Sequence, residues 1–307
     1  MSFLAHLNAA LQVTGPVVVI LVLGVIFKRI RLIDDHFLSV ANRLVSNVCL
    51  PCLLFYSVSN TDIQYLNTSL LVFAVLATII SVLVIRFASI FVVEPSKRGV
   101  FTQCAFRGNM AIMGLALCVN AFGESVLPVA AMYIAVMTVL YNVITVCLLT
   151  TPGINTVIKI GKNPLILAIV AGLLFSYFSI ELPGLVSGPI NKLSKITLPL
   201  ALLCIGGGLR LHSFRANGIE ISAASLIKLI VQPAAICIAA VMLGFRGEAL
   251  GVLFLMCATP TAAAAYVMSK QMSNHGEFAG EVITLSTLLS PLSMTVGLVT
   301  LQAMKYL

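Results

Sequence analysis

Charged residues are scarce in this chain of 307 residues: Asp, Glu, Lys and Arg make up only 9% of it, whereas hydrophobic residues make up 60%. A soluble domain carries roughly 25% charged residues. The chain therefore lacks the polar surface of a soluble enzyme, and we interpret it as an integral membrane protein. We attribute its formal net charge of +8 mostly to membrane topology, and we expect no nucleic acid among its partners.

Catalytic and nucleotide-binding signatures are also missing. No HExxH, GxSxG or Walker A pattern occurs, and these are the short motifs of zinc peptidases, serine hydrolases and P-loop ATPases. The four histidines lie outside the apolar segments or at their margins, and the eight cysteines lie inside them. Free thiols with a single CxxC spacing favour core packing over metal binding. We predict a protein that is not an enzyme and has no cofactor and no metal site.

Long apolar runs take the place of the missing polar surface. A transmembrane helix needs about 20 mostly apolar residues, and such segments recur throughout, which predicts an all-α membrane protein. We expect ten spans, at 10–28, 38–58, 68–93, 100–121, 125–150, 163–180, 189–209, 219–244, 247–269 and 280–304. Lys28, Arg29 and Arg31 follow the first span, and basic residues recur after alternate spans. Because cytoplasmic loops are enriched in Lys and Arg, both termini are expected outside.

Two similar segments indicate an internal repeat. Residues 46–55 read SNVCLPCLLF and residues 194–203 read SKITLPLALL, and they share Ser, Leu, Pro and Leu in register. Each lies in the second span of its half. We expect a first five-helix repeat at 1–150, a short cytoplasmic linker at 151–162 and a second repeat at 163–307. Because five is odd, the second repeat enters the membrane in the opposite direction, as is common in transporters.

The fourth span of each half contains residues that interrupt a helix. Gly108 and Gly114 bracket Asn109 to Met113 in one, and Thr259-Pro260-Thr261 lies in the other. Glycine costs about 1 kcal/mol in a helix, and proline removes a backbone hydrogen bond. The alternatives are a packing face around a bonded Asn109 and a simple kink at Pro260. Paired interruptions indicate a transporter's binding site, so we expect two broken helices that cross near the midplane.

The charges near these interruptions favour an anion. No Asp or Glu falls near the middle of a span, but Arg107 and Lys228 do. The N-terminal ends of half-helices also attract anions. Arg107 is expected either to attract a carboxylate or to cap a half-helix, and Lys228 to act in gating or in a salt bridge. The candidate substrate-binding residues are Asn47, Pro51, Gly108, Asn109, Met110, Pro199, Thr259, Pro260 and Thr261.

Short motifs along the whole chain resemble those of the auxin efflux carrier family, in particular its bacterial malonate-transporter-like members. The residues that carry the resemblance are Leu50-Pro51, Asn109 with Gly114, Lys162-Asn163-Pro164-Leu165-Ile166, Gly172, Leu198-Pro199-Leu200-Ala201-Leu202 with Gly206, Lys228, Pro233 and Pro260. The resemblance implies ten helices in two inverted repeats, crossed broken helices, an elevator mechanism against a scaffold, and a homodimer in the bacterial inner (plasma) membrane. Plant members often have a long loop where residues 151–162 lie, so auxin is not the expected substrate.

The expected function is secondary active transport of a small organic carboxylate by elevator-type alternating access. Coupling to H⁺ or Na⁺ stays open. One alternative is a carrier of amino acids or other neutral or zwitterionic solutes. A second alternative is a membrane sensor or a channel that binds a ligand.

Overall fold

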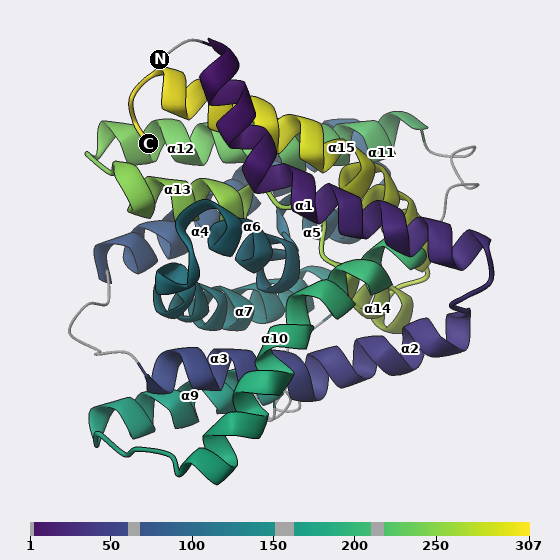
Figure 1. Ribbon diagram of the computed structural model, residues 1–307. Helices are drawn as coiled ribbons and strands as arrows, with labels where there is room; N and C mark the ends of the chain where they lie inside the picture. Colours follow the sequence, from purple (N-terminus) through teal and green to yellow (C-terminus); the bar gives the residue numbers. More distant parts are fainter. Residues whose placement is uncertain (1–2, 61–67, 151–162, 210–217) are drawn as a thin grey trace.

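The computed structural model describes residues 3–60, 68–150, 163–209 and 218–307, which form an all-helical molecule (Figure 1). In this part of the chain the only β-type pairing is an isolated antiparallel bridge between Gly108 and Thr261. The predicted linker at 151–162 lies outside the described residues. The all-α prediction is therefore confirmed for the residues described.

Seven helical segments among the described residues are long and apolar enough to cross a membrane. They contain α1 (Phe3–Arg29), α2 (Asp35–Leu44) with η1 (Val45–Cys49) and α3 (Leu50–Ser59), α4 (Thr68–Val92), η4 (Glu124–Val126) with α7 (Leu127–Leu149), α10 (Gly184–Gly207), α11 (Gly218–Leu226) with η5 (Ile227–Val231) and α12 (Gln232–Met242), and α15 (Gly276–Ala303). The result is an integral membrane protein.

The other three predicted spans are short or divided. The span at 163–180 contains α9 (Pro164–Tyr177). The span at 100–121 is divided into α5 (Arg98–Phe106) and η3 (Met110–Gly114) with α6 (Leu115–Phe122). The span at 247–269 is divided into α13 (Gly247–Cys257) and α14 (Ala263–Met272). Helix length alone thus supports seven of the ten predicted crossings.

Two π-helical turns lie just before prolines. The turn η1 precedes Pro51, and η5 precedes Pro233. Proline has no N–H and its ring crowds the carbonyl one turn back, so a wide turn lets the helix continue past it. Pro199, in contrast, lies inside α10 without such a turn. The proline-bearing segments of the two halves therefore differ in backbone path.

The helices form two groups that meet at α1 and where α7 packs against α3 and α9 (Figure 1). Helices α3, α9 and α10 pack against one another, and α1 packs on α10. The second group contains the divided spans, α7 and α15, and α1 also contacts α6 and α15 of this group. The two divided spans therefore lie inside the helical assembly rather than at its edge.

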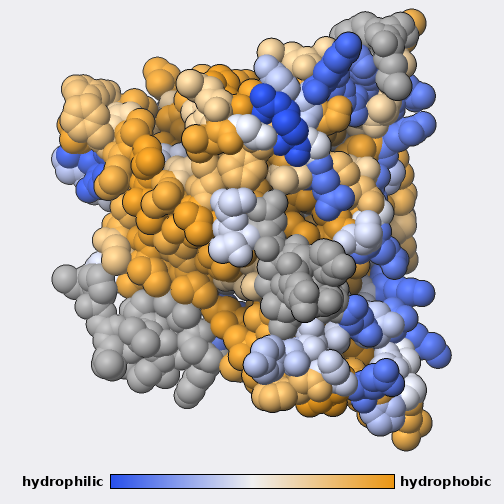
Figure 2. All heavy atoms as spheres, turned by 90° about the vertical axis from the view of Figure 1, so that its left-hand side faces the viewer, coloured by the Kyte–Doolittle hydropathy of each residue, from blue (hydrophilic) through white to orange (hydrophobic). Residues whose placement is uncertain are grey.

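Burial follows the same division. Every residue from Val100 to Phe106 and from Leu250 to Cys257 is buried. Large hydrophobic side chains are exposed instead on helices such as α1, α4 and α15. Figure 2 shows hydrophobic residues over much of one face, with hydrophilic residues gathered along one edge. This is the pattern of a protein whose outer helices face lipid and whose polar backbone breaks are enclosed by protein.

Candidate functional site

Both predicted interruptions are full breaks in the helix. Helix α5 ends at Phe106, and the next helical turn begins at Met110. Helix α13 ends at Cys257, and α14 begins at Ala263. The kink considered for Pro260 is thus wrong, since five residues leave helical geometry there. Glycine and asparagine at one break and proline at the other supply the local reasons.

The two breaks pair with each other. The backbone N–H of Asn109 donates to the carbonyl of Pro260 at 2.8 Å, and the N–H of Ala262 donates to the carbonyl of Arg107 at 2.9 Å. These bonds flank the Gly108–Thr261 bridge. A broken backbone at membrane depth needs partners for its freed polar groups, and here each break supplies partners for the other. We call this paired region, residues 107–109 and 258–262, the crossing.

Close approach at the crossing requires glycine at position 108. A Cβ there would collide with the hydroxyl oxygen of Thr259 and would lie 3.2 Å from Nζ of Lys228. Gly108 therefore acts through its lack of a side chain. As a candidate binding residue it offers only its backbone.

The threonines of the crossing stabilise the protein's own backbone. The hydroxyl of Thr259 donates to the carbonyl of Met256 at 2.8 Å. The hydroxyl of Thr261 donates to the carbonyl of Cys104 at 2.8 Å, and its backbone N–H donates to the hydroxyl of Ser286 at 3.2 Å. Both threonines are fully or almost fully buried. Their hydroxyl protons are thus occupied within the protein.

Asn109 differs from these residues. Its backbone carbonyl accepts hydrogen bonds from Met113 and Gly114 at 3.0 and 3.2 Å, whereas its carboxamide makes no hydrogen bond to any described residue. The residue is 9% exposed, and the neighbouring Met110 is 4% exposed. Its amide atoms are not among the fully enclosed, unbonded side-chain atoms of the described residues, so they reach open space. The carboxamide of Asn109 is therefore available to a ligand at the crossing.

Lys228 stabilises the end of a half-helix. Its side chain is completely buried, and Nζ donates to the carbonyl of Cys257, the last residue of α13, and to Oε1 of Gln232 at 3.3 Å. The C-terminal end of a helix carries partial negative charge, so the ammonium compensates it. The predicted salt bridge is not what the structure shows: the two acceptors are a carbonyl and an amide.

Arg107 is directed away from the crossing, toward α7. Its guanidinium donates to Oγ1 of Thr145 at 3.1 Å and to Oδ1 of Asn142 at 2.8 Å, and it lies 6.0 Å from the ring centre of Tyr141. Like Lys228, it therefore has neutral acceptors. The buried residues among those described include these two bases and no Asp or Glu. The charge around the crossing is accordingly positive.

The remaining candidates take no part in the paired backbone of the crossing. Pro199 lines a cavity of about 290 Å³ between α1, α3, α6 and α10. Asn47 is exposed on η1, which packs against α9 and α10, and Pro51 is half-buried in α3. Neither Asn47 nor Pro51 lines that cavity. Of these three residues, only Pro199 lines the cavity.

Lys195 lines the same cavity and was missed by the sequence reasoning. A signal was present, because Lys195 occupies in 194–203 the position that Asn47 occupies in 46–55. The repeat match led to the asparagine of the first segment. The structure instead places the lysine of the second segment at a cavity.

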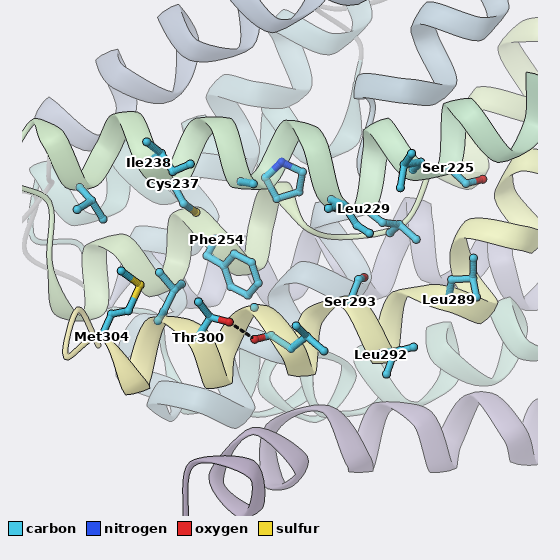
Figure 3. Close-up of a pocket in the computed structure, with 18 of the residues that line it drawn as sticks. Ser225, Leu229, Cys237, Ile238, Phe254, Leu289, Leu292, Ser293, Thr300 and Met304 are labelled. Atoms are coloured by element: carbon cyan, nitrogen blue, oxygen red, sulfur yellow. Dashed lines mark hydrogen bonds between the residues drawn. The ribbon is translucent and has the colours of Figure 1, made fainter. Parts of the chain in front are cut away.

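A larger cavity, of about 1160 Å³, lies between α11–η5–α12 and α15 (Figure 3). Apolar side chains such as Leu229, Ile238, Leu289 and Leu292 dominate its wall, and the last three are exposed. Thr300, one of its few polar residues, donates to the carbonyl of Val296 at 2.8 Å. An apolar hollow at the surface of the molecule has few hydrogen-bond donors for an anion. The larger cavity is therefore not the best candidate for the substrate site.

Comparison with known proteins assigns the chain to a family. The model of the family described as "Membrane transport protein", which corresponds to the auxin efflux carriers, matches residues 12–162 and 153–298. The chain belongs to this family. The resemblance seen in its short motifs is thereby confirmed, and the protein is a membrane transporter.

Its relatives are distant; two transporters are matched over most of their length and a plant carrier over about a third. A protein of Methanothermobacter thermautotrophicus named "Uncharacterized transporter" is 24% identical over 285 residues, which cover 91% of this chain and 94% of the relative. A Rhizobium meliloti protein named "Putative malonate transporter" is 25% identical over 302 residues, covering 92% and 94%. "Auxin efflux carrier component 5" of Arabidopsis thaliana is 26% identical over 120 residues, covering 37% and 34%.

Proposed function

We propose that this protein is a secondary active transporter of a small organic carboxylate and that the substrate binds at the crossing. The observation that carries the proposal is the carboxamide of Asn109: the residue is 9% exposed, and no hydrogen bond joins its side chain to another described residue. Its N–H₂ group is a donor that matches a carboxylate oxygen. The name of the Rhizobium meliloti relative makes malonate the first substrate to test.

The electrostatics of the crossing support an anion. The turn η3 and helix α14 both begin there, so the partial positive charge of two helix N-termini is directed at the crossing. The opposite charge at the end of α13 is compensated by Lys228. Arg107 adds a further buried positive charge. Because the buried residues described include no carboxylate, a bound anion would compensate these charges.

Transport would proceed by an elevator-type movement. In this proposal the ten predicted spans form two inverted five-helix repeats, at 1–150 and 163–307. The group with the divided spans moves against a scaffold formed by α1, α2–η1–α3, α9 and α10, and the scaffold forms the homodimer. The paired backbone bonds of the crossing support movement of the divided spans as one unit. The 290 Å³ cavity supports a boundary between α6 and the scaffold.

The test is counterflow of radiolabelled malonate in proteoliposomes that contain the purified protein. We expect preloaded unlabelled malonate to accelerate uptake of the label, and Asn109→Ala to abolish this uptake while leaving the thermal unfolding temperature near that of the wild type. Asn163→Ala is the control, because Asn163 caps α9 by accepting a hydrogen bond from the N–H of Leu165 at 2.9 Å. That variant should lose about 1 kcal/mol of stability and keep transport.

Three results would contradict the proposal. Equal loss of folded protein in Asn109→Ala would mark the carboxamide as structural. Counterflow with amino acids and not with carboxylates would favour the zwitterion carrier, and label uptake without acceleration by preloading would favour a channel.

A further inference from the structure

Charged side chains of both signs line the 290 Å³ cavity. Its wall contains one basic residue, Lys195 of α10, and one acidic residue, Glu124 at the start of η4. Neither side chain has an ion-pair or hydrogen-bond partner among the described residues, although both line one cavity. Among the uncharged polar residues of the wall, Asn120 donates to the carbonyl of Val13 and Ser194 to that of Ile190, whereas Tyr56 and Asn191 also line the cavity.

The position of Lys195 along its helix implies that this cavity holds water. Lys195 is in the middle of α10, about 17 Å from its first residue at a rise of 1.5 Å per residue. A lysine at that depth in lipid costs about 2.5–3.5 kcal/mol. Lys195 is exposed and lines the cavity, so water in the cavity would solvate its ammonium.

The cavity leads from the membrane surface toward the crossing. On α10 it is lined by Asn191, Lys195 and Pro199, which follow one another at intervals of one helical turn. On the opposite side it extends from Glu124 of η4 along α6 to Ala116, and η3, which precedes α6, begins at the crossing. On the predicted topology, Glu124 lies at the outer surface. The lysine therefore lies between the outer opening and the crossing.

We propose that this cavity is the outer vestibule of the carrier and that Lys195 binds a carboxylate of the substrate there before the substrate reaches Asn109. This inference rests on the proposed function and extends it to a second binding residue. A dicarboxylate of the size of malonate fits a cavity of this volume. Glu124 at the opening repels anions, whereas Lys195 attracts them. The relative strength of these two effects sets how strongly the vestibule selects anions over cations.

The first experiment measures this selectivity without transport. In right-side-out vesicles, Leu198→Cys places a thiol in the cavity wall. The thiol reacts with two membrane-impermeant methanethiosulfonates, the anionic sulfonatoethyl and the cationic trimethylammonioethyl reagent. Mass spectrometry of the peptide that contains the new cysteine gives the rate of each reaction. We expect Lys195→Gln to lower the ratio of the anionic to the cationic rate about tenfold, because a nearby positive charge acts in opposite directions on the two reagents. Glu124→Gln should raise the ratio.

Lys192→Gln is the matched control. Lys192 lies one turn earlier on α10, is exposed and does not line the cavity, so its removal should leave the ratio unchanged. The proposal is overturned if Lys195→Gln leaves the ratio unchanged, if Lys192→Gln lowers it equally, or if the thiol reacts only from the inner side.

A transport experiment separates this proposal from the proposed function. In malonate counterflow, Lys195→Gln should raise KM about tenfold with kcat retained, and Lys195→Arg should restore the wild-type KM, because a charge at the cavity wall acts on binding. If Asn109→Ala stops malonate transport but Lys195→Gln does not change its KM, the vestibule proposal fails alone. If the wild type carries no carboxylate but the reagent ratio depends on Lys195, the proposed substrate fails and the anion-selective vestibule stands.

Discussion

The first break leaves helical geometry through Arg107, Gly108 and Asn109, and the second through Ala258 to Ala262 with Pro260 at its centre. Both give backbone groups to the same pair of hydrogen bonds. Their side chains differ, because the threonines of the second break donate to main-chain carbonyls, whereas the carboxamide of Asn109 stays free. One break therefore serves mainly to stabilise the crossing, and the other also offers a binding group.

The largest loss of stability is expected when a side chain at position 108 forces the two breaks apart. Gly108→Ala adds a Cβ that collides with the hydroxyl of Thr259, and overpacking of this kind costs about 1–3 kcal/mol. We expect a lower thermal unfolding temperature in detergent together with loss of transport. Gly188→Ala is the control, because no atom lies within 4 Å of the added Cβ. An unchanged unfolding temperature in Gly108→Ala would show that the crossing is looser than described.

A smaller loss of stability is expected when a side chain of the second break is changed, and none when Asn109 of the first break is changed. Thr261→Val keeps the shape of the side chain but removes the hydroxyl that donates to the carbonyl of Cys104. One hydrogen bond of this kind contributes about 0.5–1.5 kcal/mol to the free energy of unfolding. The unfolding temperature should therefore fall in Thr261→Val and stay unchanged in Asn109→Ala. The reverse order would contradict the division of roles between the two breaks.

The smallest change in stability and transport is expected for Pro260→Ala. The bonds of the crossing use the carbonyl of Pro260 and the N–H of Ala262, and alanine keeps both. Replacing proline changes the entropy of the unfolded chain by about 0.4–1 kcal/mol. We expect malonate counterflow within about twofold of the wild type, which corresponds to less than 1 kcal/mol. Complete loss of transport with an intact fold would show that the proline ring itself takes part in the binding site.

The sequence predicted the two breaks well because their causes are local. Glycine, asparagine and proline disfavour a helix wherever they stand, so Asn109 and Pro260 could be identified without a structure. The partners of Arg107 could not be identified, since Asn142 and Thr145 lie more than thirty residues further along the chain. Which residues share a cavity is likewise decided by packing between distant helices.

The case of Asn47 and Lys195 shows a second limit. The repeat match places them in equivalent positions, but only Lys195 lines the cavity. Asn47 lies in the π-helical turn η1, whereas Lys195 lies in the regular helix α10. One additional residue in a turn rotates the following helix face by about 100°. Two residues at equivalent positions of the similar segments can therefore point in different directions in the structure.

The bridge at the crossing also has a consequence for biogenesis. Cys104 and Thr261, which are joined by a side-chain hydrogen bond next to the bridge, are 157 positions apart along the chain. Domains fold from the N-terminus as they are synthesised, and contacts between distant residues form late. The backbone at Gly108 therefore enters the membrane before its partners exist. We expect a nascent chain that ends before Ala262 to stay dependent on the insertion machinery or on chaperones.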